Sequence, residues 1–434
     1  MSADELSAST IKSRRIVYLV FATVTLLVLG LIYAWSIFAT PIGVDYPEYK
    51  GLLGQVFQVS MFAFCVSALF GAQLIKKTSA KLTIIVAAAL LGAGFVLTTV
   101  GVSLGIWSLF VFYGILAASG CGIAYNAIIS LVNPWFPDRI GLASGIMMMG
   151  FGVSSLVFAS LANAMFTLVD WQVVFIAIAV VGVIVMVALA LVVKPAPKTL
   201  GQTLGLSGSA GTIQVTPTQK QSIFKTKVFW LFCIWATIVI ACGLTVIGRA
   251  AQGADALGVA TVTFEGFPAL LVGLVSTMNG IGRVINGTVF DKFGLVPVMA
   301  LAAVCAFIAM ALLALSFTVT LPFVYIVGAI VVAFPYSAVP VMASAYARQR
   351  YNPADFAKNL GIANCNIAVA ATVNIVIAFF LGSIGDLDKV TGAPVNDNIV
   401  FAILGVLTLV ALGAVFAFAK TYKADLAKIK EELS

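Results

Sequence analysis

Arg283 interrupts a run of apolar residues, 267–290, that is long enough to cross a lipid bilayer. A lone arginine at the centre of a membrane helix costs about 3 kcal/mol on insertion scales, so a protein keeps one where a partner anion compensates the charge. No acidic residue stands at comparable depth in the sequence. An anion that binds to Arg283 is therefore the first chemical hypothesis. The alternative is a helix-packing arginine that is bonded to Asn279, to Asn286 and to backbone carbonyls on its own helical face.

Other polar side chains stand at membrane depth in further apolar runs, among them Gln55, Tyr125 and Asn126. Such groups can bind a ligand, but they serve as often as links between helices, worth about 0.6 kcal/mol on average. The sequence has no histidine, its six cysteines lack paired metal-ligand spacing, and the apolar runs hold no acidic pair. We therefore expect no metal, no cofactor and no enzyme active site.

Composition identifies the solvent that surrounds these residues. The chain is 62% hydrophobic and 9% charged, whereas soluble domains carry about 25% charged residues. A helix needs about 20 apolar residues to cross the hydrocarbon core of a bilayer. The sequence therefore predicts an all-α membrane protein with twelve spans, which are 16–39, 52–75, 82–102, 104–132, 141–166, 171–193, 227–250, 267–290, 295–318, 321–346, 359–384 and 398–419.

Positive charges indicate the orientation of the spans, because Lys and Arg near span ends are retained on the cytoplasmic side. With both termini in the cytoplasm, twenty Lys and Arg residues lie inside, and only Lys50, Arg249 and Lys389 lie outside. The net charge of +8 follows from this asymmetry, so it predicts no nucleic-acid partner. The N-terminus lacks a signal-peptide cleavage pattern. We expect a monomer surrounded by lipid in a plasma membrane, and the short loops suit a bacterial cytoplasmic membrane.

A polar stretch at 194–226 separates the first six spans from the last six. Its Lys, Gly, Ser, Thr, Gln and Pro residues are typical of a flexible cytoplasmic linker. The flanking segments, 1–193 and 227–434, are then two six-helix bundles. This layout is typical of carriers whose halves rock about a midplane site and expose it to each side in turn. A transporter is therefore the leading class.

Four motifs carry a resemblance to a known family. They are GCGIAYNAIISLVNPWFPDRIGLASG at 120–145, YAWSIFATP at 33–41, NGIGRVINGTVFDKFG at 279–294 and NLG at 359–361. With these motifs the chain resembles the oxalate/formate antiporter family of the major facilitator superfamily, which is related to the monocarboxylate porters. The resemblance runs over nearly all spans and implies the major facilitator fold.

The loop after the eighth span also resembles that superfamily, which carries a glycine, acid, base, glycine pattern there. The pattern is matched by Gly287, Asp291, Lys292 and Gly294. Glycines permit close helix contact and a sharp turn, and the acid can cap or pair with neighbouring helix ends. In the equivalent loop after the second span, Ile75 occupies the acid position, so we interpret the two loops as a partly eroded repeat. The alternative is an ordinary basic turn.

The resemblance further implies a central anion site between the halves, where an arginine of the eighth helix binds a carboxylate among aromatic side chains. Arg283 matches the arginine, and the matching aromatic residues are Tyr33, Trp35, Tyr125 and Tyr336.

One position departs from the family pattern. The resemblance implies a second cation, a lysine of the eleventh helix, and that position is Ile367, near the uncharged Asn364. A single guanidinium leaves one charge of a dianion uncompensated, so we expect a monocarboxylate held by the forked donors of Arg283. Asn279, Gln55 and Asn364 are expected to supply hydrogen bonds at the same site.

The sequence leaves the coupling open between exchange of one anion for another and symport with a proton. A proton relay within the protein is not expected, because the spans offer neither an acid nor a histidine. Two other functions stay open: an oxalate/formate type of antiporter that exchanges a dicarboxylate for a monocarboxylate, and a membrane sensor that binds without transport. Ile367 is the residue that separates the two kinds of transporter.

Overall fold

The computed structural model describes residues 8–166, 168–197, 200, 223–247, 250–264, 267–351, 355–381 and 396–433. These residues form helices and connecting turns, with no strand among them. Each of the twelve predicted spans corresponds to one helix or to a few consecutive helical pieces. The all-α fold predicted from composition is confirmed.

The chain divides into two compact units. Unit 1 comprises Met1–Thr216 and Ala347–Cys365, and unit 2 comprises Pro217–Tyr346 and Asn366–Ser434. Most of the polar stretch that we interpret as a linker, 201–222, lies outside the described residues. The bundle boundaries 1–193 and 227–434 therefore stay a prediction.

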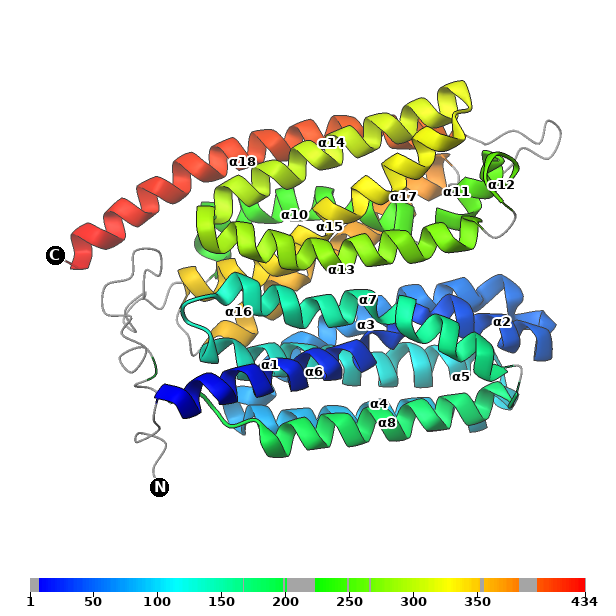
Figure 1. Ribbon diagram of the computed structural model, residues 1–434, viewed down its shortest axis with the longest axis horizontal. Coiled ribbons are helices and arrows are strands. Elements are labelled where there is room, and N and C mark those ends of the chain that lie inside the picture. Colours follow the sequence, from blue (N-terminus) through cyan, green and yellow to red (C-terminus); the bar gives the residue numbers. More distant parts are fainter. Residues whose placement is uncertain are drawn as a thin grey trace. The chain divides into compact units, whose positions relative to one another are not determined.

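Unit 1 is built from helices that run alongside one another, drawn from blue to green in Figure 1 except for the short segment 356–364, which is orange. Helix α3 packs along α6, α4 along α8, and α1 along α7. Close approach depends on small residues: an added Cβ at Gly122 of α6 would lie 2.1 Å from the carbonyl oxygen of Phe64 in α3. The helices are α1 (Ala8–Leu29), α2 (Trp35–Asp45), α3 (Lys50–Lys77), α4 (Ala80–Gly101), α5 (Ile106–Ser108), α6 (Ala118–Val132), α7 (Ile140–Phe166), α8 (Trp171–Val192) and α16 (Phe356–Asn364).

Two membrane helices of unit 1 are irregular where the sequence predicts continuous spans. A 3₁₀ stretch, η2 (Gly30–Ala34), joins α1 to α2, and a π-helical stretch, η5 (Leu109–Ala117), precedes α6. Irregular turns inside a helix often mark hinges and functional sites. They are therefore relevant to the site described below.

The short helix α16 packs on α3 and α6 within unit 1. The fully buried amide of Asn126 in α6 donates to the carbonyl oxygens of Ala68 (3.0 Å) and Ala357 (2.8 Å). At the beginning of α16, Asp355 forms an ion pair with Lys76. Asn126, a candidate ligand group from the sequence, thus joins three helices.

Unit 2 is built in the same way. Helix α18 packs along α14 and α10, and α10 also packs along α17. Its helices are α10 (Lys227–Ile247), α11 (Ala250–Ala256), α12 (Val259–Val262), α13 (Phe267–Phe293), α14 (Leu295–Val319), α15 (Pro322–Arg350), α17 (Asn366–Leu381) and α18 (Asp397–Leu433), and the last four residues of α15 are grouped with unit 1.

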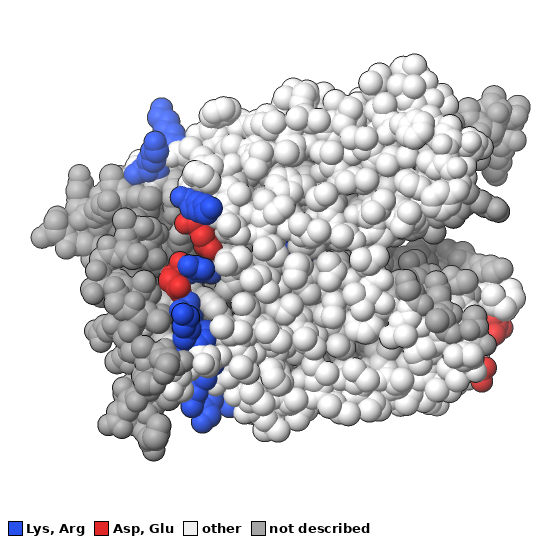
Figure 2. All heavy atoms as spheres, viewed as in Figure 1, with Lys and Arg blue, Asp and Glu red and all other residues white. Residues whose placement is uncertain are grey.

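The helix flanks are suited to lipid. Within the described residues, ten helices are long and apolar enough to cross a membrane. The other two predicted spans are α13, where Arg283 and its neighbouring asparagines lower the hydropathy, and the eleventh, which is divided into α16 and α17. Large apolar side chains such as Phe70 and Phe416 are exposed. Figure 2 shows that, in each unit, the charged side chains in view lie at helix ends and leave the flanks uncharged.

Candidate functional site

Helix α13 holds Arg283 in the interior of unit 2. Its side chain is buried, with 2% of the residue surface exposed. The guanidinium Nε donates to Asn279 Oδ1 at 3.4 Å, one turn earlier on the same helix. A permanently charged group at this depth is costly unless polar groups or a counter-ion surround it. The structure therefore confirms the burial on which the anion hypothesis depends.

Asn286, on the next turn of α13, makes different contacts. Its amide donates to Gly282 O at 2.8 Å and, across to α15, to Ser337 Oγ at 3.0 Å. A longer bond of 3.3 Å reaches Phe334 O. Its Oδ1 accepts no hydrogen bond within the described part of the chain. Of the two asparagines expected beside Arg283, only Asn279 bonds to it, and Asn286 links α13 to α15.

Tyr336 of α15 is buried, with 5% exposed, and its ring lies against Gly243 of α10. An added Cβ at Gly243 would come within 2.5 Å of the Tyr336 side chain, so a glycine is needed there to accommodate the ring. Two prolines inside α15, Pro335 and Pro340, adjoin this position. Proline lacks a backbone N–H, so α15 loses the two helical hydrogen bonds that these positions would otherwise donate.

In unit 1 the structure brings two predicted aromatic residues onto one phenylalanine. Tyr33 in η2 and Tyr125 in α6 each pack edge-on against Phe151 of α7, with ring centroids 5.2 Å apart in both pairs. Phe64 of α3 lies 5.5 Å from Tyr125 and 5.8 Å from Phe151. Edge-to-face pairs of this kind stabilise a fixed arrangement of rings. Phe64 and Phe151 were missed by the sequence reasoning, because a phenylalanine in an apolar helix carries no distinguishing signal.

Trp35 begins α2 and is almost fully buried. Its indole Nε1 donates to Leu53 O at 2.6 Å, and its ring lies 4.3 Å from that of Tyr113 in η5. The polar atom of Trp35 is thus used within unit 1, so this residue offers a ligand only the face and edges of its ring.

Two predicted hydrogen-bonding residues have different outcomes. Asn364 ends α16 and is buried, and its Nδ2 finds no acceptor among the described residues. A buried amide donor without a partner is uncommon and requires an explanation, of which a bound ligand is one. The side chain of Gln55 lies outside the described residues.

The predicted loop after α13 makes a sharp turn. Gly294 has φ +84° and ψ −173°, a backbone conformation open essentially to glycine alone, and its N–H donates to Phe290 O at 2.8 Å. Asp291 and Lys292 are exposed at the end of α13, whereas Gly287 is buried one turn earlier. The turn suits the predicted use of glycine at position 294.

Taken one at a time, the units supply different chemistry. Unit 2 buries a cation that can hold a carboxylate by two parallel N–H···O bonds. Unit 1 supplies the cluster of Tyr33, Phe64, Tyr125 and Phe151, which offers ring surface and phenolic hydroxyls, and the amide of Asn364. Rings with a few polar groups among them are typical of the walls of small-molecule sites.

Long apolar helices and lipid-suited flanks define an integral membrane protein, and a cation buried within a membrane helix commonly marks a substrate or ion pathway. The family description "Major Facilitator Superfamily" matches residues 16–373. The chain therefore belongs to the major facilitator superfamily. It is a transporter rather than an enzyme, as the sequence predicts.

Three relatives illustrate the range of the similarity. An uncharacterized MFS-type transporter, YhjX of Escherichia coli (strain K12), is 24% identical over 357 residues, 82% of this chain and 86% of that protein. The oxalate:formate antiporter of Oxalobacter formigenes is 25% identical over 280 residues, 64% of this chain and 63% of that protein. Monocarboxylate transporter 9 of Gallus gallus is 35% identical over 63 residues, 14% of this chain and 12% of that protein.

Solved structures share the fold. The proton:xylose symporter XylE, bound to 6-bromo-6-deoxy-D-glucose, has a TM-score of 0.67 at 16% identity and covers 94% of this chain and 96% of its own. A bacterial homologue of the iron transporter ferroportin has a TM-score of 0.67 at 13% identity, with 92% and 98% covered. These similarities confirm the predicted twelve-helix fold of the superfamily.

Proposed function

We propose that this protein is a secondary transporter of small organic carboxylate anions, and of monocarboxylates in particular. The observation that carries the proposal is Arg283, a permanent cation buried to 98% in a membrane helix and oriented by Asn279. The similarity to an oxalate:formate antiporter and, over a short segment, to a monocarboxylate transporter supports the same class of substrate.

Arg283 binds the carboxylate in this account. The guanidinium has five N–H donors in a planar fork, and a carboxylate can accept two of them in parallel. Asn279 Oδ1 accepts from Nε, which orients the plane of the fork. Charge-assisted bonds of this kind are roughly twice as strong as neutral ones.

The body of the substrate then contacts aromatic and amide groups. We assign this contact to Tyr33, Tyr125 and Tyr336, to the ring of Trp35, and to the amides of Asn364 and Gln55. Asn364 has the clearest capacity among these, because its buried Nδ2 lacks an acceptor within the described residues. An oxygen of a hydroxy or keto acid would accept this hydrogen bond.

Charge balance favours a monocarboxylate over a dianion. The position expected for a second cation is Ile367, which is half-buried in α17. In a low-dielectric site one guanidinium compensates one carboxylate, and a second negative charge would carry a desolvation cost of several kcal/mol. Formate, acetate, lactate and pyruvate meet this condition.

Transport follows from alternating access of the bound anion to the two sides of the membrane. Because the sequence places no acid or histidine in the spans, we propose that the protein exchanges anions or moves a proton on the carboxyl group of the substrate itself. We further propose that it acts as a monomer in a bacterial cytoplasmic membrane, with both termini inside. The positive-inside asymmetry of the sequence supports this orientation.

Counterflow into proteoliposomes tests the proposal, with labelled formate, acetate, lactate, pyruvate and oxalate each assayed against the same unlabelled acid. Wild type is compared with Arg283→Gln and with Lys423→Gln, which removes an exposed cation in the C-terminal part of α18. We expect uptake of at least one monocarboxylate that is lost in Arg283→Gln and retained in Lys423→Gln. Uptake of none of these acids, or equal uptake by the two variants, would contradict the proposal.

The similarity to the oxalate:formate antiporter favours a second candidate, exchange of a dicarboxylate for a monocarboxylate. The two candidate functions predict different uptake of oxalate by proteoliposomes. Vesicles loaded with formate take up labelled oxalate if the second function is correct, whereas our proposal expects little oxalate uptake by wild type.

A further inference from the structure

The first membrane helix changes its geometry without a proline at the point of change. Helix α1 ends at Leu29, the 3₁₀ stretch η2 follows, and α2 begins at Trp35. Pro41 lies further along, inside α2. In a 3₁₀ stretch each carbonyl accepts a hydrogen bond from the N–H three residues later, whereas in an α-helix it accepts from the N–H four residues later. Side chains that hydrogen bond to the carbonyls of this stretch can therefore fix it.

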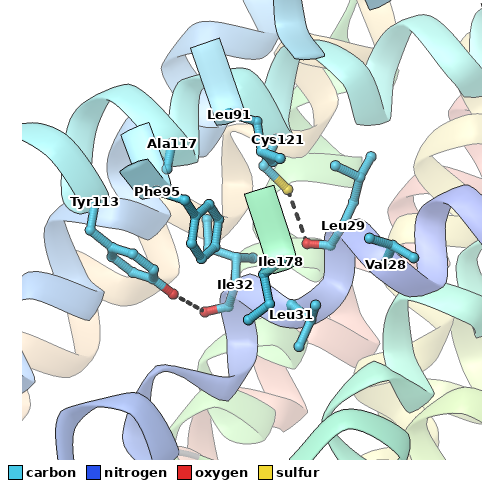
Figure 3. Close-up of a pocket in the computed structure, with 10 residues that line it drawn as sticks. All are labelled: Val28, Leu29, Leu31, Ile32, Leu91, Phe95, Tyr113, Ala117, Cys121 and Ile178. Carbon is cyan, nitrogen blue, oxygen red and sulfur yellow. Dashed lines mark hydrogen bonds between the residues drawn. The ribbon is translucent and has the colours of Figure 1, made fainter. Parts of the chain in front are cut away.

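Two such side chains come from the fourth membrane helix. Tyr113 Oη donates to Ile32 O at 3.3 Å, and Cys121 Sγ donates to Leu29 O at 3.3 Å. Both residues are almost completely buried, with 0% and 1% exposed. Figure 3 shows both side chains directed at these carbonyls of the first helix.

The ring of Tyr113 makes a second connection to the same segment. It lies 4.3 Å from the ring of Trp35, the first residue after η2, and meets Phe95 edge-on at 5.6 Å. Tyr113 itself stands in the π-helical stretch η5, and π-helical stretches within α-helices are often found at functional sites. One tyrosine thus holds η2 by its hydroxyl and the beginning of α2 by its ring.

A small cavity lies beside these contacts. It has a volume of about 10 Å³, and its lining is apolar apart from Tyr113 and Cys121 and includes Leu31, Leu91 and Ile178. This is about the space of one water molecule, so it is no ligand site.

We propose that Tyr113 is a positioning residue: it fixes the 3₁₀ stretch Gly30–Ala34 and thereby the direction of Tyr33 toward the substrate. Tyr33 lies within that stretch, one residue after the carbonyl that Tyr113 binds. The effect of Tyr113 on transport rests on the proposed function. Its effect on the backbone of residues 30–34 does not.

Hydrogen exchange of the purified full-length protein tests whether Tyr113 fixes the backbone of residues 30–34. Tyr113→Phe removes only the hydroxyl and keeps the ring against Trp35. Tyr325→Phe is the matched control, because Tyr325 is equally buried and its hydroxyl donates to Ala250 O at 3.0 Å in unit 2. We expect the amides of 30–34 to exchange about five-fold faster in Tyr113→Phe, the effect of one lost hydrogen bond of about 1 kcal/mol, and to be unchanged in Tyr325→Phe.

Cys121→Ala provides a second variant if Tyr113→Phe does not fold, and we expect a smaller acceleration at the same amides. Unchanged exchange at 30–34 in Tyr113→Phe, or an equal rise there in Tyr325→Phe, would overturn the proposal. Transport is measured with whichever of formate, acetate, lactate or pyruvate the wild type carries. We expect a several-fold higher KM for Tyr113→Phe alone.

An unchanged KM together with faster exchange would overturn the link between Tyr113 and the site. If wild type carries none of these acids, the proposed function fails, and the exchange measurement still decides whether Tyr113 fixes the stretch.

Discussion

Arg283 and Asn279 form a hydrogen-bonded pair in which the asparagine oxygen orients the guanidinium. The bond between them is long, at 3.4 Å, so its contribution to stability is small and its effect is mainly directional. Asn286 stands on the same helix but links α13 to α15 through Gly282 O and Ser337 Oγ. The two asparagines should therefore respond differently to substitution.

Asn279→Ala should raise the KM for the transported acid several-fold with little loss of thermal stability, because the guanidinium loses its orienting acceptor. Asn286→Ala should lower stability by about 1–3 kcal/mol, because buried groups of α15 lose their donor, with a smaller effect on KM. Transport kinetics and thermal unfolding of both variants give the comparison. A stability loss confined to Asn279→Ala would contradict these assignments.

Ile367→Lys should shift selectivity toward dianions, because an added ammonium supplies the second positive charge that oxalate requires. The measurement is the ratio of oxalate to formate uptake in proteoliposomes, with Ile367→Met as a control of similar volume and no charge. We expect the ratio to rise in the lysine variant and to be unchanged in the methionine variant. An unchanged ratio in the lysine variant would show that residue 367 is not at the site.

Sequence reasoning could find Arg283 because a charge in an apolar run is unusual, and Tyr125 because it is a polar group at membrane depth. It could find Tyr33 and Tyr336 only through family resemblance. It could not find Phe151 or Tyr113, since aromatic residues in apolar helices look alike in sequence. Their contacts with Tyr33 and Ile32 depend on which helix faces meet, and this is decided by tertiary packing.

At the scale of elements, hydropathy predicts where the helices run but not where they change geometry. Hydropathy predicts the eighth span at 267–290, and α13 occupies Phe267–Phe293. No proline marks three changes of geometry in the sequence: the 3₁₀ stretch that begins at Gly30, the π-helical stretch that begins at Leu109 and the division of the eleventh span at Cys365. Such irregularities are stabilised by side chains of neighbouring helices, as Tyr113 stabilises η2.

Gly294→Ala should destabilise the turn between α13 and α14 by about 1–3 kcal/mol, because the backbone there has φ +84° and ψ −173°. Gly413→Ala is the matched control, since it lies within α18 and an added Cβ meets nothing within 4 Å. Alanine favours a helix over glycine, so this control should be neutral or stabilising. Equal midpoints of thermal unfolding for the two variants would contradict the structure of this turn.

Asn126→Ala should loosen α16, because the carbonyls of Ala68 and Ala357 lose a shared buried donor. We expect a loss of about 2 kcal/mol and faster hydrogen exchange in α16. Asn374→Ala is the control, since that amide donates to Ala241 O at 3.1 Å in unit 2. Equal exchange of α16 in both variants would show that Asn126 does not hold this helix.

At the scale of the whole molecule, composition and charge placement were sufficient for the fold class, and the superfamily match over residues 16–373 confirms it. Orientation is a separate prediction. A green fluorescent protein fused after Ser434 should be fluorescent, and an alkaline phosphatase fused there should be inactive, because both reporters sense the side on which they fold. The reverse pattern would contradict the orientation predicted from the positive charges.

We propose that Arg283 binds the carboxylate of the substrate. Equilibrium binding of the transported acid to purified wild type, Arg283→Gln and Lys423→Gln tests it most directly, because it separates binding from later steps of transport. A hydrogen bond to a charged group contributes about 1.5–3 kcal/mol. We therefore predict that Arg283→Gln binds at least ten-fold more weakly while Lys423→Gln binds as wild type does. Equal affinity of wild type and Arg283→Gln would contradict the claim and return Arg283 to a role in helix packing.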